Sequence, residues 1–242
     1  MVSPDTMQMW DPRGATVCDL KDLYTEFLIL NEARILDLGC GNGHVARNIA
    51  TSEPSATVVA VEFDTIQHAE NLKAESLPNL QFEFGSAERI PQPDESFDAV
   101  LMIKSLHHVP ANRMDQALRE VRRVLHLEGV AFIIEPVFRG AFNEIMRVFN
   151  DEKDTRIAAF ESVRDTILSG SMTLVEELFF LSSLKIPDFN AFEEQYVKVT
   201  HSDYRLSTEQ RKEIREKFDQ HMKPGGAVFK MPMRLDLLKK KN

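Results

Sequence analysis

The sequence has 242 residues, of which 43% are hydrophobic and 28% charged, an ordinary composition for a globular chain of one or two domains. Its net charge of −9 disfavours nucleic acid as a partner, because an acidic protein is repelled by phosphate backbones. Two cysteines argue against a disulfide scaffold, and no apolar run is long enough to span a membrane. We therefore expect a cytoplasmic protein without a membrane partner.

The first 136 residues alternate short apolar runs with amphipathic segments. The runs are continuously apolar, as in strands that are covered by helices on both faces. This alternation predicts a doubly wound, mostly parallel α/β sheet with a ligand at the carboxyl ends of the strands. The predicted strands are residues 35–38, 57–61, 80–84, 97–103 and 130–134, and the predicted helices are residues 15–31, 65–74, 113–126 and a segment beginning near Gly43.

Beyond Pro136 the alternation stops. No linker rich in glycine, serine and proline follows, so we expect one domain overall, with residues 137–226 as a largely helical insertion that includes the sixth strand. The predicted elements are helices over 138–185 with a break at 169–171, a strand over 195–200, a charged helix over 207–222 and a last strand over 227–238.

The most informative segment is residues 37–43 (DLGCGNG), between the first predicted strand and the following helix. Glycines in such a turn allow a tight bend and a close approach of the backbone to a ligand. The acidic Asp37 would repel a pyrophosphate but attract an ammonium group. Glu62, at the end of the second strand, is placed to accept hydrogen bonds from ribose hydroxyls. The pattern therefore disfavours a dinucleotide.

These residues, with 85–88 (GSAE), 97–98 (FD), 107–108 (HH) and 123–129, resemble the class I S-adenosylmethionine-dependent methyltransferases. The similarity is closest to their small-molecule branch, often called type 11, and covers roughly residues 30–136. It implies a Rossmann-like seven-stranded mixed sheet with a helical insertion, in which the strand at 227–238 runs antiparallel and closes the sheet. It also implies S-adenosyl-L-methionine as the cofactor.

Carried over by position, the resemblance places the methionine moiety on the glycine turn, the ribose on Glu62 and the adenine near Phe63. The family often has an acidic residue after the glycine of its next motif, where this chain has Ser86, so the adenine contacts fall on Ser86 and the two residues after it. The predicted cofactor-binding residues are Asp37, Gly39, Cys40, Gly41, Asn42, Gly43, Glu62, Phe63, Ser86, Ala87, Glu88 and Lys104. We expect residues 1–136 to form the cofactor-binding core and residues 137–226 to form the acceptor lid. Residues 227–242 are expected to form the closing strand and a basic tail.

Three side chains at the ends of the fourth and fifth strands are candidates for catalysis: His107, His108 and Glu135. An imidazole or carboxylate there is able to accept a proton from an attacking group, but a packing role for the histidine pair stays open. Glu135 could instead hold a cationic amine, and the acids that follow it favour a cationic acceptor. Lys104 has two alternatives to cofactor binding, namely a solvated ammonium or a contact with an anionic group of the substrate. Trp10, before the first strand, either closes the site or packs at an edge.

No zinc-protease motif or cysteine cluster is present, so we expect no metal site. The sequence thus predicts a methyltransferase that acts on a small-molecule acceptor by O- or N-methylation, as a monomer or homodimer. The alternatives are a nicotinamide dehydrogenase, a regulatory protein that binds S-adenosylmethionine without catalysis, and a protein or RNA methyltransferase.

Overall fold

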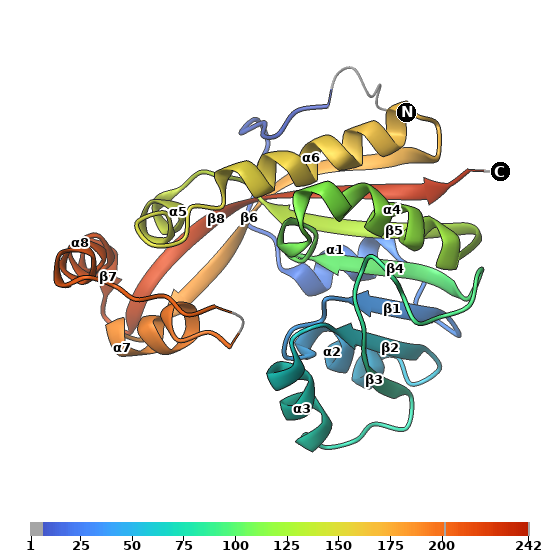
Figure 1. The fold of residues 1–242 in the computed structure, drawn as a ribbon, viewed down its shortest axis with the longest axis horizontal. Helices are drawn as coiled ribbons and strands as arrows, with labels where there is room; N and C mark the ends of the chain where they lie inside the picture. Colours follow the sequence, from blue (N-terminus) through green and yellow to red (C-terminus); the bar gives the residue numbers. More distant parts are fainter. Residues whose placement is uncertain (1–6, 201, 242) are drawn as a thin grey trace.

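The chain folds around one twisted β-sheet, described in a computed structural model over residues 7–200 and 202–241 (Figure 1). The strands are β1 (Arg34–Leu38), β2 (Thr57–Glu62), β3 (Leu80–Phe84), β4 (Phe97–Ile103), β5 (Leu125–Pro136), β6 (Met172–Ile186), β7 (Met222–Lys223) and β8 (Gly226–Lys240). Their order is β3-β2-β1-β4-β5-β8-β6, with the two-residue β7 paired to β8. Strands β1 to β5 are parallel, and β8 is antiparallel to β5 and β6. The predicted Rossmann-like mixed sheet with an antiparallel closing strand is confirmed.

Helices cover both faces of the sheet (Figure 1). They are α1 (Leu20–Phe27), α2 (His44–Ser52), α3 (Thr65–Lys73), α4 (Met114–Val124), α5 (Ala141–Met146), α6 (Lys153–Leu168), α7 (Phe189–Phe192) and α8 (Thr208–Asp219). The buried residues of α4 and α6 form one core with Leu36 and Val100, and those of α1 and α2 form a second core with Ile35 and Leu101. Within residues 7–200 and 202–241, no helix has the length and apolar character needed to cross a membrane.

The strand order reverses between β1 and β4, the point at which doubly wound sheets bind ligands. From β1 the chain proceeds outward through β2 to β3, and from β4 it proceeds the other way through β5. The chain therefore leaves the carboxyl ends of β1 and β4 in opposite directions, the arrangement in which doubly wound sheets bind ligands. Residues 39–43 and 104–108 occupy these two loops.

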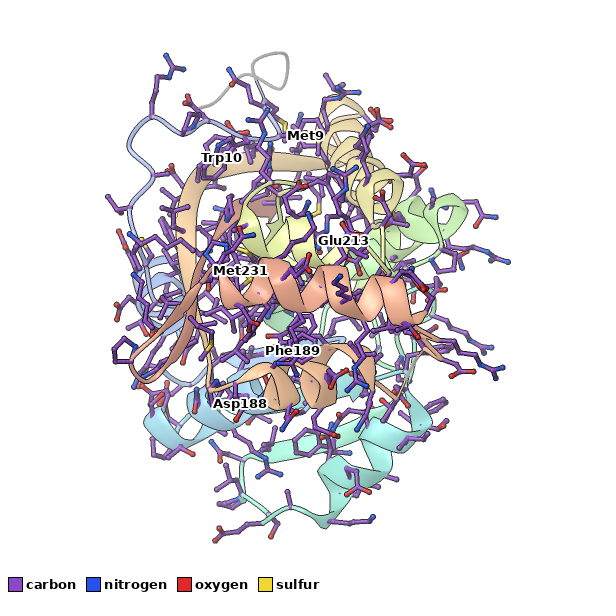
Figure 2. All side chains as sticks on the ribbon, turned by 90° about the vertical axis from the view of Figure 1, so that its left-hand side faces the viewer. Met9, Trp10, Asp188, Phe189, Glu213 and Met231 are labelled. Carbon is purple, nitrogen blue, oxygen red and sulfur yellow. The ribbon has the colours of Figure 1, made fainter. Side chains whose placement is uncertain are left out.

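The two longest strands, β6 and β8, continue beyond the sheet as a two-stranded ribbon. They pair from Met172 and Lys240 to Ile186 and Ala227, whereas β5 reaches only as far as Met233 of β8. We call the projecting part, residues 181–232, the arm. Figure 2 looks onto it, with α8 across the front and Phe189 below the helix. A third core, rich in phenylalanine, joins the arm to α5.

Two predicted elements beyond Pro136 are wrong. Residues 172–186, expected to be helical, form β6. Residues 195–200, expected to form the sixth strand, instead follow α7 through a π-helical turn at Glu193–Val197. The leucine-rich stretch of β6 has no strong strand preference of its own, and its conformation is imposed by pairing with β8, whose partners lie some fifty residues later.

Candidate active site

The glycine turn leaves β1 and bends back over the end of β2. The amides of Gly39 and Cys40 both donate to the carbonyl of Val61, at 2.9 and 3.0 Å. Gly39 has φ +73°, and a Cβ on it would lie 2.6 Å from the Cβ of Ser105, so only glycine fits against the loop after β4. A Cβ on Gly41 would meet no atom within 4 Å. The turn is thus packed at its base and open at its tip.

Glu62 fixes the tip of the turn. One carboxylate oxygen accepts the amide of Gly41 at 2.7 Å, and the other accepts the amides of Phe63 and Asp64 at 2.9 and 2.8 Å. A carboxylate offers about four lone-pair positions, so at least one remains for a ligand hydroxyl. Asn71 of α3, for which the sequence holds no signal, supports the same tip by donating to the Gly41 carbonyl at 2.7 Å.

Asp37 lies beneath the turn rather than in the cleft. It shares a strand face with Ile35 and points toward the first turn of α2, where it accepts the backbone amide of Ala46. Burial, reinforced by the charge of Glu62, raises the pKa of Asp37 to about 7. One of its oxygens is buried with no partner among the described residues. Any effect of Asp37 on a ligand is transmitted through the turn and the electrostatic field.

The predicted adenine side carries exposed aromatic rings. Phe63 is 68% exposed, and its ring stacks on Phe84 with the centroids 6.2 Å apart. Ser86, Ala87 and Glu88 follow in a half-buried turn. An open glycine tip, a carboxylate at the end of β2 and a neighbouring exposed ring fit a nucleoside whose ribose lies on Glu62. Cys40 and Asn42 belong to the turn itself: burial raises the pKa of the Cys40 thiol, and the Asn42 side chain accepts the amide of His44 at 3.2 Å.

At the other side of the cleft, the structure brings His107 and Glu135 together. His107 lies in a 3-10 turn (Leu106–His108) and is only 5% exposed. Its Nδ1 is hydrogen-bonded to one oxygen of Glu135, whose other oxygen accepts the amide of Leu106 at 2.9 Å. Because a carboxylate only accepts, this bond places the imidazole proton on Nδ1. The neighbouring His108 is exposed, and its ring lies 4.1 Å from that of His107.

The second nitrogen of His107 faces Glu152, at 3.9 Å. Glu152 lies at the start of α6 and is ion-paired with Arg156, 2.6 Å away. Arg156 also donates to Asn143 of α5 at 3.0 Å. A polar chain therefore runs from Glu135 through His107, Glu152 and Arg156 to Asn143. In the sequence, Glu152 resembles an ordinary solvent-facing residue of a helix, and nothing marks Arg156 as functional. Their proximity to His107 arises only because the fold brings α5, α6 and β5 together.

One cluster of three side chains has the composition of a metal site, although the sequence predicts no metal site. Ligand atoms of His107, His108 and Glu152 all lie within 4.8 Å of one another. However, the guanidinium of Arg156 already neutralises Glu152, and a cation so close opposes the binding of a second one. We therefore assign this cluster to proton and hydrogen-bond chemistry.

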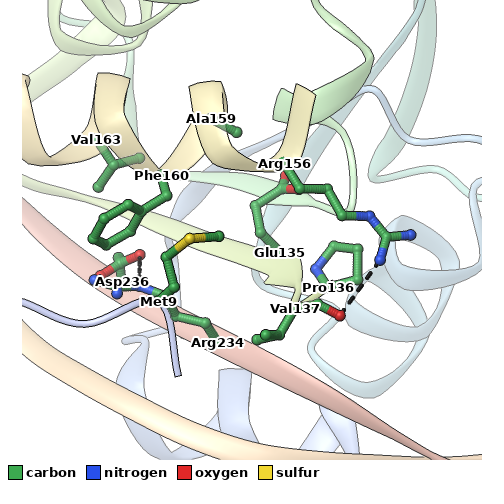
Figure 3. Close-up of a pocket in the computed structure, with 10 residues that line it drawn as sticks. All are labelled: Met9, Glu135, Pro136, Val137, Arg156, Ala159, Phe160, Val163, Arg234 and Asp236. Atoms are coloured by element: carbon green, nitrogen blue, oxygen red, sulfur yellow. Dashed lines mark hydrogen bonds and ion pairs between the residues drawn. The ribbon is translucent and has the colours of Figure 1, made fainter. Parts of the chain in front are cut away.

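Behind Glu135, between α6 and β8, lies a cavity of about 20 Å³, which has room for one water molecule (Figure 3). Met9, Arg234 and Asp236 are among the residues that line it (Figure 3). It is too small for an organic molecule. Of the two alternatives for Trp10, the structure has the packed one: its ring packs edge-on against Phe179 of β6, with the ring centroids 5.7 Å apart.

Lys104 and Thr200 complete the outline of the cleft. Lys104, at the end of β4, has φ +56°, and its side chain reaches solvent. The protein around it removes part of its hydration, which lowers the pKa of its ammonium group. Thr200, in the arm, donates a hydrogen bond from its hydroxyl to Asp64, which caps α3. The arm therefore touches the core beside Glu62 and Phe63.

Comparison with known proteins identifies sequences that are similar to this chain. Residues 35–129 match the model of a methyltransferase domain. The chain is 34% identical over 128 residues to the 27-O-demethylrifamycin SV methyltransferase of Amycolatopsis mediterranei, covering 50% of this chain and 46% of the relative. It is 35% identical over 96 residues to a fatty-acid O-methyltransferase of Mycolicibacterium smegmatis, covering 40% and 34%. The matched part thus spans less than half of each of these relatives.

The fold is shared over almost the whole chain. The crystal structure of YcgJ from Bacillus subtilis superposes with a TM-score of 0.60 and 18% identity, covering 92% of this chain and 98% of that one. A putative methyltransferase from Bacillus halodurans superposes with a TM-score of 0.61 and the same coverage and identity. Residues 35–129 thus match a methyltransferase domain, and the whole sheet has the fold of these solved structures.

Proposed function

We propose that the protein transfers the methyl group of S-adenosyl-L-methionine to a small-molecule acceptor by O- or N-methylation. The observation that carries this proposal is the carboxylate of Glu62, held by three backbone amides beside an open glycine tip at the switch point of the sheet. When bound, the cofactor would supply an electrophilic methyl group for in-line displacement. The name of one relative, a fatty-acid O-methyltransferase, supports oxygen as the acceptor atom.

Each part of the predicted cofactor site has a task in this proposal. Gly39, Cys40, Gly41, Asn42 and Gly43 shape the turn that receives the methionine moiety, with Asp37 beneath it. Glu62 accepts from the ribose, while Phe63, Ser86, Ala87 and Glu88 surround the adenine. Catalysis then consists mainly of holding the acceptor in line and excluding water, for which orientation contributes ~7–11 kcal/mol in favourable cases.

The catalytic group in this proposal is His107, His108 and Glu135. Glu135 holds the proton of His107 on Nδ1 and fixes its ring, and the His108 ring lies against it. His108 is the exposed member, so it is placed to take a proton from an acceptor hydroxyl. Residues 137–226 form the lid over the acceptor, with the arm touching the core through Thr200.

Calorimetric titration with S-adenosylhomocysteine tests the cofactor site. We expect Glu62→Ala to weaken binding about 10- to 100-fold, because it removes charge-assisted hydrogen bonds to the ribose and frees the Gly41 amide. The control is Glu70→Ala, which removes an exposed carboxylate from the nearby helix α3. Unchanged affinity in Glu62→Ala, or no wild-type binding better than millimolar, would contradict the proposal. Tight binding without methyl transfer to a broad metabolite panel would favour a regulatory protein instead.

A further inference from the structure

The acids at the acceptor end of the cleft are already satisfied. Glu135 accepts from His107 with one oxygen and from the Leu106 amide with the other. Glu152 accepts from Arg156 at 2.6 Å and, with its second oxygen, from Asn150 at 2.9 Å. All four carboxylate oxygens therefore have partners. Arg156 neutralises Glu152, and each of these oxygens already accepts one hydrogen bond, so the acids attract a cationic acceptor less than unpaired carboxylates would.

The groups left without partners along this polar chain are donors. The amide nitrogen of Asn143, a residue only 5% exposed, has no hydrogen-bond partner among the described residues, and neither does Nε of Arg156. Within residues 7–200 and 202–241, the Lys104 ammonium makes no hydrogen bond or ion pair. The first two donors are buried, where a missing partner is costly, whereas the Lys104 side chain reaches solvent; a ligand that presents oxygen atoms suits all three. The composition of the site thus matches an oxygen-rich, negatively charged ligand.

Lys104 is the charged member of this set, and its backbone is held from both sides. Its amide donates to the Ile134 carbonyl at 2.7 Å, and the hydroxyl of the next residue, Ser105, donates to the Leu38 carbonyl at 2.8 Å. The left-handed conformation of Lys104, φ +56°, is uncommon for a residue with a side chain and persists because these contacts enforce it. The ammonium is therefore anchored at the end of β4, between the glycine turn and Glu135.

We propose that Lys104 binds a carboxylate in this cleft and that the carboxylate belongs to the methyl acceptor, which is then an organic acid rather than an amine. This rests on the proposed methyltransferase function. The alternative source of a carboxylate is the methionine end of the cofactor. The Lys104 amide is bonded to Ile134, the residue beside Glu135 on the acceptor side, which favours the acceptor as the source.

The first experiment compares matched acceptors. Carboxylic acids, their amides and the amines of the same carbon skeleton are supplied with S-adenosylmethionine, and formation of S-adenosylhomocysteine is measured. We expect acids to be preferred, and Lys104→Met to lower kcat/KM for acids about 10- to 100-fold, mostly through KM, with partial recovery in Lys104→Arg. Lys21→Met, which removes an exposed ammonium from α1, is the control. Amines or amides used as well as acids, with no effect of Lys104→Met, would overturn the proposal.

A second experiment separates the two sources and does not need turnover. S-adenosylhomocysteine and 5′-methylthioadenosine, which lacks the amino-acid moiety, are titrated into the wild type and Lys104→Met. We expect both affinities to change less than about twofold, since removing a hydrogen bond to a charged group would change them more. Selective loss of S-adenosylhomocysteine affinity would assign Lys104 to the cofactor and overturn the acceptor claim. Absence of wild-type binding to either nucleoside would instead refute the methyltransferase function itself.

Binding of the same acids to the complex with S-adenosylhomocysteine gives a pH signature. Burial lowers the pKa of Lys104, so its positive charge is lost at a pH below its ordinary value of 10.5. Acid affinity should therefore fall as the pH rises through this pKa, and Lys104→Met should abolish the dependence. If no acid in the panel binds the wild-type complex more tightly than its amide, the proposal is wrong.

Discussion

Asp37 is a carboxyl group that the fold makes costly to ionise. It is 2% exposed, one of its oxygens has no partner among the described residues, and burial raises its pKa to about 7. Its folded pKa thus exceeds the ordinary value of 3.8, so the folded state retains a proton that the unfolded state loses between these values. The stability that this proton contributes is present at acidic pH and is lost as the pH rises through about 7.

We therefore expect Asp37→Asn to become more stable relative to the wild type as the pH rises from 4 to 8. The difference in unfolding free energy between the two proteins should change by at most about 4 kcal/mol, the free energy that corresponds to a pKa raised from 3.8 to about 7. Urea unfolding of both proteins at pH 5, 6.5 and 8 measures it, with the exposed Asp115→Asn as a control for the loss of a negative charge. A stability difference that is constant across this range would contradict the assignment.

At the scale of elements, the site depends on two loops packed against each other. The loop after β1 touches the loop after β4 where Gly39 meets Ser105. Gly14 supplies a matched comparison, because it has φ +80° but a Cβ on it would meet no atom within 4 Å. Alanine at either position incurs the cost of a left-handed conformation, but only alanine at position 39 also collides with a neighbour.

Gly14→Ala should reduce the free energy of unfolding by about 1–2 kcal/mol, and Gly39→Ala by about 2–5 kcal/mol. Gly39→Ala should also weaken S-adenosylhomocysteine binding, because the displaced loop carries the Gly41 amide that holds one oxygen of Glu62. Denaturant unfolding and calorimetry measure the two effects. Equal destabilisation by the two substitutions would mean that the Gly39–Ser105 contact relaxes without cost.

Elements that depend on local signals could be predicted from the sequence, and those that depend on distant pairing could not. The strands of the parallel half are continuously apolar because helices cover both faces, and the glycine turn is a contiguous motif beside its strand. Strand β6 depends instead on β8, and residues 195–200 follow the packing of the arm. The ends of the fourth and fifth predicted strands already brought His107 and Glu135 to one edge of the sheet, but the approach of Glu152 at the start of α6 has no pattern in the sequence.

At the scale of the whole molecule, Arg234 joins parts of the chain that are far apart in sequence. It is 4% exposed and ion-paired with Asp236 at 2.6 Å and Glu177 of β6 at 2.8 Å. Its guanidinium lies over the ring of Phe160 of α6 and donates to the carbonyl of Gln8. One side chain of β8 thus holds β6, α6 and the N-terminal segment.

Arg234→Ala should destabilise the protein by about 3–5 kcal/mol, because it leaves two largely buried carboxylates without their cation. Removing the charges together, as Arg234→Met with Asp236→Asn and Glu177→Gln, should recover more than half of that loss. Equilibrium unfolding in urea measures both variants. A triple variant no more stable than Arg234→Ala would show that packing and the Gln8 contact, rather than the stranded charges, account for the loss.

The position of β8 also has a consequence for how the protein is made. It is the last strand in the sequence, yet it lies between β5 and β6 in the sheet. While the ribosome still holds residues 226–240, the emerging chain carries unpaired edges on β5 and β6, and such edges invite pairing with other chains. The sheet is completed only when residues 226–240 have emerged, so β8 joins the fold after the loops that follow β1, β2 and β4.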